Sequence, residues 1–276
     1  MLGKLLKYEF KSTMRLFLPT YAATIVFALL SRLFLSVSAL QNFWGGRLFS
    51  IVLMLYVLII LMTFVLTFVL VIQRFYKNLL RDEGYLSNTL PVSVDSHIWG
   101  KAIPATIWSI LSFIVVMASL FILILSKDNL TYFMDNWSSF LSEYNTYTSM
   151  SIGLLIFELI ILLIISILSS TMAFYASLCI GQLANSHKVL LSIVAYFCLG
   201  IVVGMLTTAI SGSALINMGD LFVGDYYYDT NTYTGTIITA ADIMQVIGIT
   251  AITQIVTGAI YYFISRYVLK RKLNLE

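Results

Sequence analysis

The residues best suited to chemistry are the charged side chains of the segment Gln73–Lys101, which separates two long apolar runs. They mix both signs and comprise Arg74, Lys77, Arg81, Asp82, Glu83 and Asp95. Because charge is costly to place near hydrocarbon, we expect water or a protein partner to meet these side chains. The chemistry that they favour is recognition through ion pairs and hydrogen bonds, and the segment is the first place to look for function.

Motifs for catalysis and for nucleotide or metal binding do not occur in the sequence. It contains no GxxxxGK[ST] phosphate loop, no HExxH and no GxSxG. His97 and His187 lie in separate polar segments, and Cys179 and Cys198 lie within apolar runs. Since a metal centre or catalytic site needs several converging groups, we expect no catalytic residue, no bound cofactor, no metal and no enzyme activity in this chain.

Two charges, Arg32 and Glu158, are placed inside apolar runs. A charged side chain at mid-membrane costs about 2.5–3.5 kcal/mol on insertion scales, which favours a partner or a wet cavity. Three interpretations stay open. The two residues pair with each other, they line a polar path, or Arg32 extends to the headgroups and needs no partner.

These residues must be positioned by membrane-spanning helices. The chain has 60% hydrophobic and 11% charged residues and a mean hydropathy of +0.94, outside the range of soluble domains. Six runs have the roughly 20 apolar residues that a spanning helix needs. They are Phe17–Leu40, Leu48–Ile72, Ala102–Leu125, Ile152–Ile180, Val189–Ser211 and Ile243–Ser265. The prediction is an all-α, polytopic membrane protein with six spans that form one transmembrane domain, residues 1–276.

The distribution of basic residues predicts the orientation. If six spans alternate, one side carries Lys4, Lys7, Lys11, Arg15, Arg74, Lys77, Arg81, Lys101, Lys188, Arg266, Lys270, Arg271 and Lys272. The opposite loops hold only Arg47 and Lys127 and are rich in acidic residues. By the positive-inside rule, both termini and the 73–101 loop are cytoplasmic, and the chain is a multi-pass protein of the cytoplasmic membrane.

The polar segments have recognisable characters. Residues 1–16 place Lys4, Lys7, Lys11 and Arg15 on one helical stripe, as in a basic amphipathic helix on the membrane surface that ends before Pro19. The alternative is a basic flank that only sets topology.

The outer loops 127–150 and 212–242 are aromatic, and their tyrosines are more plausible as interfacial anchors than as ligand contacts. Gly200 and Gly204 form a GxxxG motif, for which we expect helix packing, with self-association as a second option.

Within the 73–101 loop, Arg74–Leu80 is expected to continue the second span before the chain breaks at Arg81–Gly84. Tyr85–Leu90 can form a short transverse helix that ends before Pro91, since proline disfavours helix in the preceding residue. Ser93–Trp99 is a second short polar piece before the third span. A short helix with exposed apolar side chains suits docking in a groove.

The run Phe75–Val92, FYKNLLRDEGYLSNTLPV, resembles the cytoplasmic loop of permease subunits of type-2 ABC exporters, of the compact six-span Gram-positive kind. Leu5–Lys11 is similar to their opening interfacial helix, and Gly181-Gln-Leu resembles their second cytoplasmic turn. The resemblance implies two separately encoded ATPase subunits, which bind ATP and Mg, and a second copy of this permease or a related one. It also implies a coupling helix whose contacts with the ATPase are Arg81, Asp82, Glu83, Gly84, Tyr85, Leu86, Leu90 and Pro91, with Glu9 beside them.

The function implied by this resemblance is ATP-driven export of an amphipathic or peptide-like cargo across the cytoplasmic membrane. The expected partners are the ATPase subunits, the second permease and the lipid bilayer, and no nucleic acid. A second class of function remains open. In it the chain is a membrane sensor or assembly factor that transports nothing, and its inner loop binds a cytoplasmic regulator. An ion-coupled secondary transporter is a further alternative, although internal repeats and interrupted helices are not evident.

Overall fold

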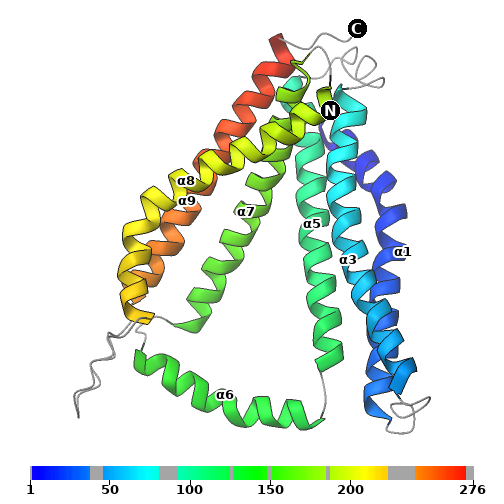
Figure 1. Ribbon diagram of the computed structural model, residues 1–276, viewed down its shortest axis with the longest axis vertical. Coiled ribbons are helices and arrows are strands. Elements are labelled where there is room, and N and C mark those ends of the chain that lie inside the picture. The colour runs from blue at the N-terminus through cyan, green and yellow to red at the C-terminus, as the bar shows by residue number, and fades with distance from the viewer. Residues whose placement is uncertain are drawn as a thin grey trace. The chain divides into compact units, whose positions relative to one another are not determined.

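A computed structural model describes residues 2–37, 46–80, 93–124, 127–147, 151–184, 187–222 and 240–271. These ranges contain seven α-helices and one π-helical turn (Figure 1). In chain order they are α1 (Leu2–Ser36), α3 (Arg47–Phe75), η2 (Tyr76–Leu80), α5 (Val94–Ile124), α6 (Lys127–Tyr147), α7 (Ile152–Gly181), α8 (Lys188–Phe222) and α9 (Ala240–Arg271). The all-α prediction is confirmed for these ranges.

Six of the helices are long and apolar enough to cross a membrane. The candidate spans are Gly3–Ser36, Arg47–Leu80, Val94–Ile124, Ile152–Gly181, Lys188–Ala209 and Met244–Arg271. They coincide with the six runs predicted from sequence, in the same order. The number of spans and the polytopic architecture are therefore as expected on length and composition.

The chain separates into two compact units. The first comprises Met1–Thr131 with Arg266–Glu276, and the second comprises Tyr132–Ser265. The single transmembrane domain expected from sequence stays a prediction, and each unit is described by itself.

In the first unit, α1, α3 and α5 pack against one another. Their core contains a stacked ring pair, Phe17 on α1 and Trp108 on α5, with centroids 4.6 Å apart and an interplanar angle of 11°. Leu70 of α3 completes this buried cluster, and Phe10 and Tyr21 pack on its edges. One aromatic cluster thus joins all three helices.

Farther along the same helices, buried hydroxyl groups join the three helices in pairs. Tyr21 Oη and Ser112 Oγ are 2.7 Å apart, and Ser112 Oγ lies 2.8 Å from Thr67 Oγ1. Thr24 and Thr63 also share a hydrogen bond, at 3.1 Å. Because hydrocarbon offers polar groups no alternative partner, such bonds help to hold spanning helices together, typically by about 0.6 kcal/mol each.

In the second unit, α7 packs closely on α8, and α9 approaches α7 where small residues meet. Phe174 and Tyr196 stack with centroids 4.7 Å apart. A Cβ atom added to Gly258 of α9 would lie 3.3 Å from Ser169 Oγ and 3.5 Å from Ser169 Cα on α7, so Gly258 lets the two helices approach closely at this point.

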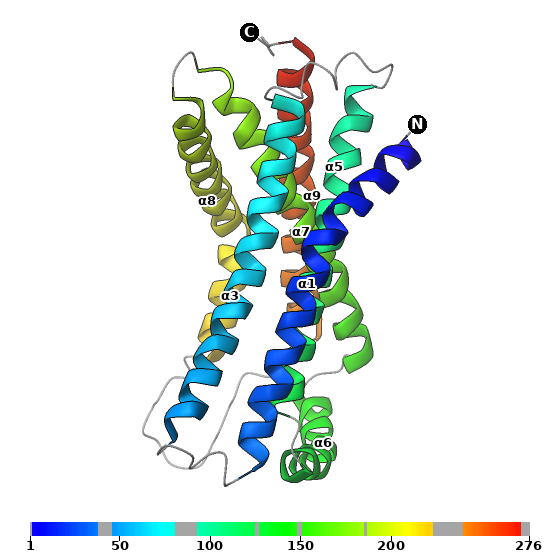
Figure 2. The same cartoon turned by 90° about the vertical axis from the view of Figure 1, so that its right-hand side faces the viewer.

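The first helix differs from the prediction. Residues 1–16 were expected to form a separate interfacial helix, but α1 runs from Leu2 to Ser36 through Pro19. Proline removes one backbone donor and here does not end the helix, and Figure 2 shows the first turns of α1 slanting away from the rest. Lys4, Lys7, Lys11 and Arg15 are all exposed along it, as their spacing predicted.

Two polar segments predicted as short pieces or loops are also helical. Ser93–Trp99 was expected to be separate from the third span, but α5 begins at Val94 and continues to Ile124. The outer loop 127–150 contains the 21-residue helix α6. In the other outer loop, 212–242, α8 extends to Phe222 and α9 begins at Ala240.

Candidate functional site

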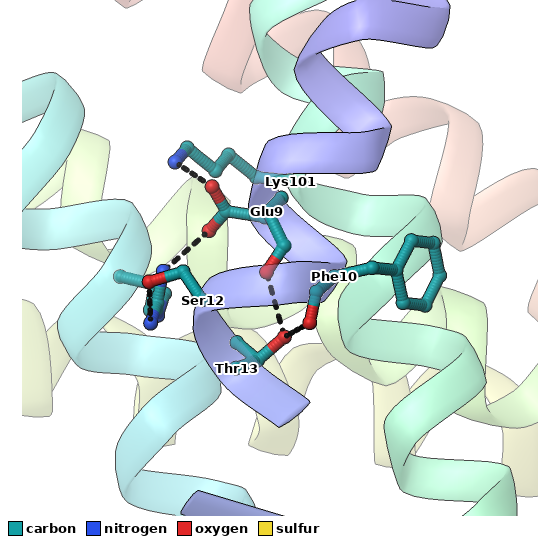
Figure 3. A network of polar contacts seen from close by, with 6 residues as sticks. Glu9, Phe10, Ser12, Thr13 and Lys101 are labelled. Atoms are coloured by element: carbon teal, nitrogen blue, oxygen red, sulfur yellow. Dashed lines mark hydrogen bonds and ion pairs between the residues drawn. The ribbon is translucent and has the colours of Figure 1, made fainter. Parts of the chain in front are cut away.

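The most highly connected ionic site joins the first turns of α1 to α3 and α5. Glu9 Oε1 accepts a hydrogen bond from Arg74 Nη1 at 3.3 Å, and Glu9 Oε2 accepts one from Lys101 Nζ at 2.7 Å. Arg74 Nη2 also donates to Ser12 Oγ at 2.8 Å. We call Glu9, Ser12, Arg74 and Lys101 the Glu9 clasp, and Figure 3 shows the carboxylate of Glu9 at its centre.

The clasp is largely shielded from solvent. The exposed fractions of the side chains are 13% for Glu9, 14% for Lys101 and 21% for Arg74. Ion pairs at such depth are screened by salt less than exposed pairs are. One carboxylate compensates two cations, so loss of Glu9 would leave two neighbouring positive charges in a partly buried place.

The elements of the clasp are positioned by ordinary helix packing. Leu5 of α1 lies against Gly100 of α5, where an added Cβ would be 3.7 Å from Leu5 Cβ. Phe10, one residue after Glu9, packs its ring 6.1 Å from that of Trp108. These contacts bring α1 onto α5 on both sides of Glu9, and its carboxylate then reaches Lys101.

The Glu9 clasp holds both stems of the segment 81–92. Arg74 lies near the end of α3, and η2 extends that helix to Leu80, with Leu79 and Leu80 buried. Lys101 lies in the first turns of α5, which begins after Ser93. Ser93 Oγ accepts from the backbone N–H of Ser96 at 3.3 Å, as serine at a helix start commonly does. The expected continuation of the second span through Arg74–Leu80 is therefore confirmed.

A second ion pair lies close to the start of α5. Arg266 Nε is 2.9 Å from Asp95 Oδ1, and the two side chains are 42% and 36% exposed. An exposed pair of this kind contributes about 0–1 kcal/mol. The Glu9 clasp, which is more buried and joins three helices, is the more consequential of the two.

Most of the predicted partner-contact residues lie outside the described residues. They are Arg81, Asp82, Glu83, Gly84, Tyr85, Leu86, Leu90 and Pro91. Glu9, the remaining member of that set, directs its carboxylate to Arg74 and Lys101. Its direct contact with a partner stays a prediction, and the structure adds a role in positioning the two stems.

The other predicted sites have varied positions. Arg32 lies on α1 and Glu158 on α7, which belong to different units, so their pairing stays a prediction. Among the described residues, a Cβ atom added at Gly200 or Gly204 would meet no atom within 4 Å. Among the described glycines of the second unit, an added Cβ would be crowded at Gly181 and Gly258, and the packing or self-association expected at Gly200 and Gly204 stays a prediction.

The turn after α7 brings α7 and α8 together at Gly181. A Cβ atom added there would lie 2.7 Å from the carbonyl oxygen of Lys188 and would collide with the side chain of Ser192. His187, in the same turn, has φ of 57°, a left-handed conformation that is uncommon for a residue other than glycine. In the part of the chain that the structure describes, no group of three or more His, Cys, Asp or Glu residues could hold a metal ion.

Sequence reasoning identified Glu9, Arg74 and Lys101 as charged residues but not as one cluster. Their separations along the chain, 65 and 92 residues, carry no local pattern. One usable signal existed. Glu9 is an acidic residue among the basic residues of the N-terminal segment, and such a carboxylate needs cations nearby.

The fold and this site define a class, an α-helical protein with six candidate membrane spans and a partly buried ionic clasp that joins α1, α3 and α5. Comparison of the chain with known protein families, with curated proteins and with solved structures finds no match.

Proposed function

We propose that this chain is the membrane-spanning permease subunit of an ATP-binding cassette exporter and works with separate ATPase subunits. The observation that carries the proposal is the Glu9 clasp, which ties both stems of the segment 81–92 to the N-terminal helix. The sequence of that segment, with its DEGYL and TLPV runs, supplies the resemblance to a coupling helix.

The proposed mechanism is mechanical coupling through the first unit. A partner that displaces the 81–92 segment acts on α3 through η2 and on α5 through its first turn. The Glu9 clasp makes α1 move with both, because its carboxylate bonds to Arg74 and Lys101 together. The stacked pair of Phe17 and Trp108 continues that linkage farther along the helices.

The energetic requirement is that the partner ATPase binds the loop differently in its open and closed states. A partner that binds both states of the permease with equal affinity does not shift the equilibrium between them. In this proposal ATP and Mg are bound by the ATPase, and closure of the ATPase dimer opens or alternates the interface between two permease copies. The cargo class is amphipathic or peptide-like, and both termini lie in the cytoplasm.

The test is purification of the tagged full-length chain from its native host together with any protein that carries a phosphate-loop motif. ATPase turnover of the complex is then measured in proteoliposomes. Glu83→Gln and Tyr85→Ala should each lower turnover about tenfold, equivalent to about 1.4 kcal/mol of lost coupling. Asp135→Asn on α6 is the matched control, a charge removal outside the loop that should leave turnover unchanged.

Equal turnover in all three variants would refute the assignment of the loop. Absence of a phosphate-loop protein, both from the purified complex and from the neighbouring genes, would favour the sensor or assembly factor. A neighbouring gene that encodes an ATPase with that motif would support the exporter before any protein is purified.

A further inference from the structure

The helix α6 carries a largely one-sided apolar surface, and most of its side chains are exposed in the part of the chain that the structure describes. Its large apolar residues recur every three or four positions and so fall on one face of the helix. They are Leu130, Phe133, Met134, Trp137, Phe140, Leu141 and Tyr144, whereas Tyr132, which is 72% exposed, falls on the opposite side. Phe133 is 55% exposed and Met134 is 65% exposed. We call these seven residues the α6 apolar face.

The aromatic members of this face form a continuous ladder. The ring centroids of Phe133 and Trp137 are 5.2 Å apart, those of Trp137 and Phe140 are 5.5 Å apart, and Phe140 and Tyr144 follow at 6.4 Å. Trp and Tyr concentrate where a bilayer meets water, because their rings are apolar and carry one polar group. The composition of the face therefore suits the membrane interface better than the hydrocarbon centre or bulk water.

The connections of α6 hold both of its ends close to spanning helices. It begins at Lys127, three residues after α5 ends at Ile124, and it ends at Tyr147, five residues before α7 begins at Ile152. A 21-residue helix is about 30 Å long, whereas five residue steps reach at most about 18 Å. If α5 and α7 are successive spans, α6 cannot stand upright from the membrane and still return the chain to α7.

The arrangement within the second unit agrees with this geometry. Figure 1 shows α6 running at a steep angle to α7. A helix that crosses the direction of a spanning helix lies roughly along the membrane plane. The short connections and the direction of α6 therefore favour a position of the whole helix along the membrane surface.

We propose that α6 is a surface helix that inserts its apolar face into the outer interface of the bilayer. The opposite face supports this orientation, because it carries Asp135, Asn136, Ser139 and Ser142, all exposed. After Lys127 the helix contains no basic residue. Apolar and aromatic burial, and not attraction to anionic lipid, therefore holds it at the interface. The proposal is independent of the partner ATPase.

The experiment is spin labelling of the full-length protein in vesicles of phosphatidylcholine. In a background with Cys179→Ala and Cys198→Ala, single cysteines replace Phe133 and Leu141 on the apolar face. Matched controls replace Asp135 and Ser139 on the opposite face of the same helix. Collision of each label with oxygen, which concentrates in lipid, is compared with collision with a water-soluble nickel chelate.

Labels at 133 and 141 should favour oxygen, and labels at 135 and 139 should favour the nickel chelate. Adding phosphatidylglycerol should not deepen the apolar-face labels, because α6 lacks the basic residues that anionic lipid would attract. Favoured nickel collision at all four positions would place α6 in water and overturn the proposal. Low collision with both reagents at 133 and 141 would show a protein contact, such as a second copy of the chain, and would overturn it equally.

Discussion

Removing the charge of Glu9 should destabilise the first unit through both of its cationic partners. Two unit charges about 3 Å apart attract by about 5 kcal/mol at an effective dielectric constant near 20. Desolvation of the ions offsets most of this attraction. Exposed surface ion pairs contribute about 0–1 kcal/mol, and breaking a fully buried pair costs about 3–5 kcal/mol. The burial of the clasp lies between these two cases. We therefore expect Glu9→Gln to lower the free energy of unfolding by about 2 kcal/mol.

The assay is a double-mutant cycle on the full-length protein in detergent micelles, unfolded with dodecyl sulfate and followed by circular dichroism. The cycle with Glu9→Gln and Lys101→Gln should give a coupling energy of about 1–2 kcal/mol. The cycle with Arg74→Gln should give a smaller value. Arg74 Nη1 is 3.3 Å from the Glu9 carboxylate, compared with 2.7 Å for Lys101 Nζ, and its side chain is more exposed. When Glu9 is replaced, Arg74 also keeps its hydrogen bond to Ser12.

Two controls separate this coupling from general destabilisation. Asp135→Asn combined with Lys101→Gln should be additive, because Asp135 belongs to the second unit and the Glu9 clasp to the first. The Glu9–Lys101 coupling should persist in about 0.5 M NaCl, since partly buried pairs are screened weakly. A coupling energy within about 0.5 kcal/mol of zero, or one that salt abolishes, would refute the reasoning.

Four further single substitutions test the packing of the two units, and each is measured as a change in the free energy of unfolding. Trp108→Ala should cost about 3–5 kcal/mol, because it removes the buried ring stacked in the three-helix core. Thr63→Val should cost about 0.6 kcal/mol, because it removes the hydrogen bond to Thr24. Replacing both Thr24 and Thr63 by valine should cost no more than the single substitution, because the same bond is lost. Gly181→Ala should cost about 1–3 kcal/mol through collision with α8, whereas Gly200→Ala, with no described atom within 4 Å, should be neutral or slightly stabilising. Equal effects of the two glycine substitutions would contradict the described packing of α7 and α8.

The spanning helices were predictable because their signal is local. Each needs about 20 apolar residues, and the six runs found in the sequence match the six candidate spans. The continuation of the second span to Leu80 was also readable, since the break signals begin only at Arg81.

The errors arose where local signals compete. Pro19 indicated a boundary, but the helix continues because Phe17 before the proline and Tyr21 after it both pack on Trp108 of α5. The helix α6 was readable from the three-and-four spacing between Leu130 and Tyr144, yet its polar composition suggested a loop. Glu9 stood out as a carboxylate among basic residues, but its pairing with Arg74 and Lys101 could not be derived, because the three residues meet only through tertiary packing.

The sequence separations within the Glu9 clasp have a consequence for how the protein is made. Glu9 is synthesised with the first helix, but its partners follow 65 and 92 residues later. In a chain synthesised from its N-terminus, the carboxylate stays uncompensated until Arg74 has emerged and is fully paired only with Lys101. The first unit can therefore reach its final arrangement only after the start of α5 has been synthesised. Nascent chains truncated before that point would carry an open clasp, a state that membrane quality-control factors could distinguish from the assembled unit.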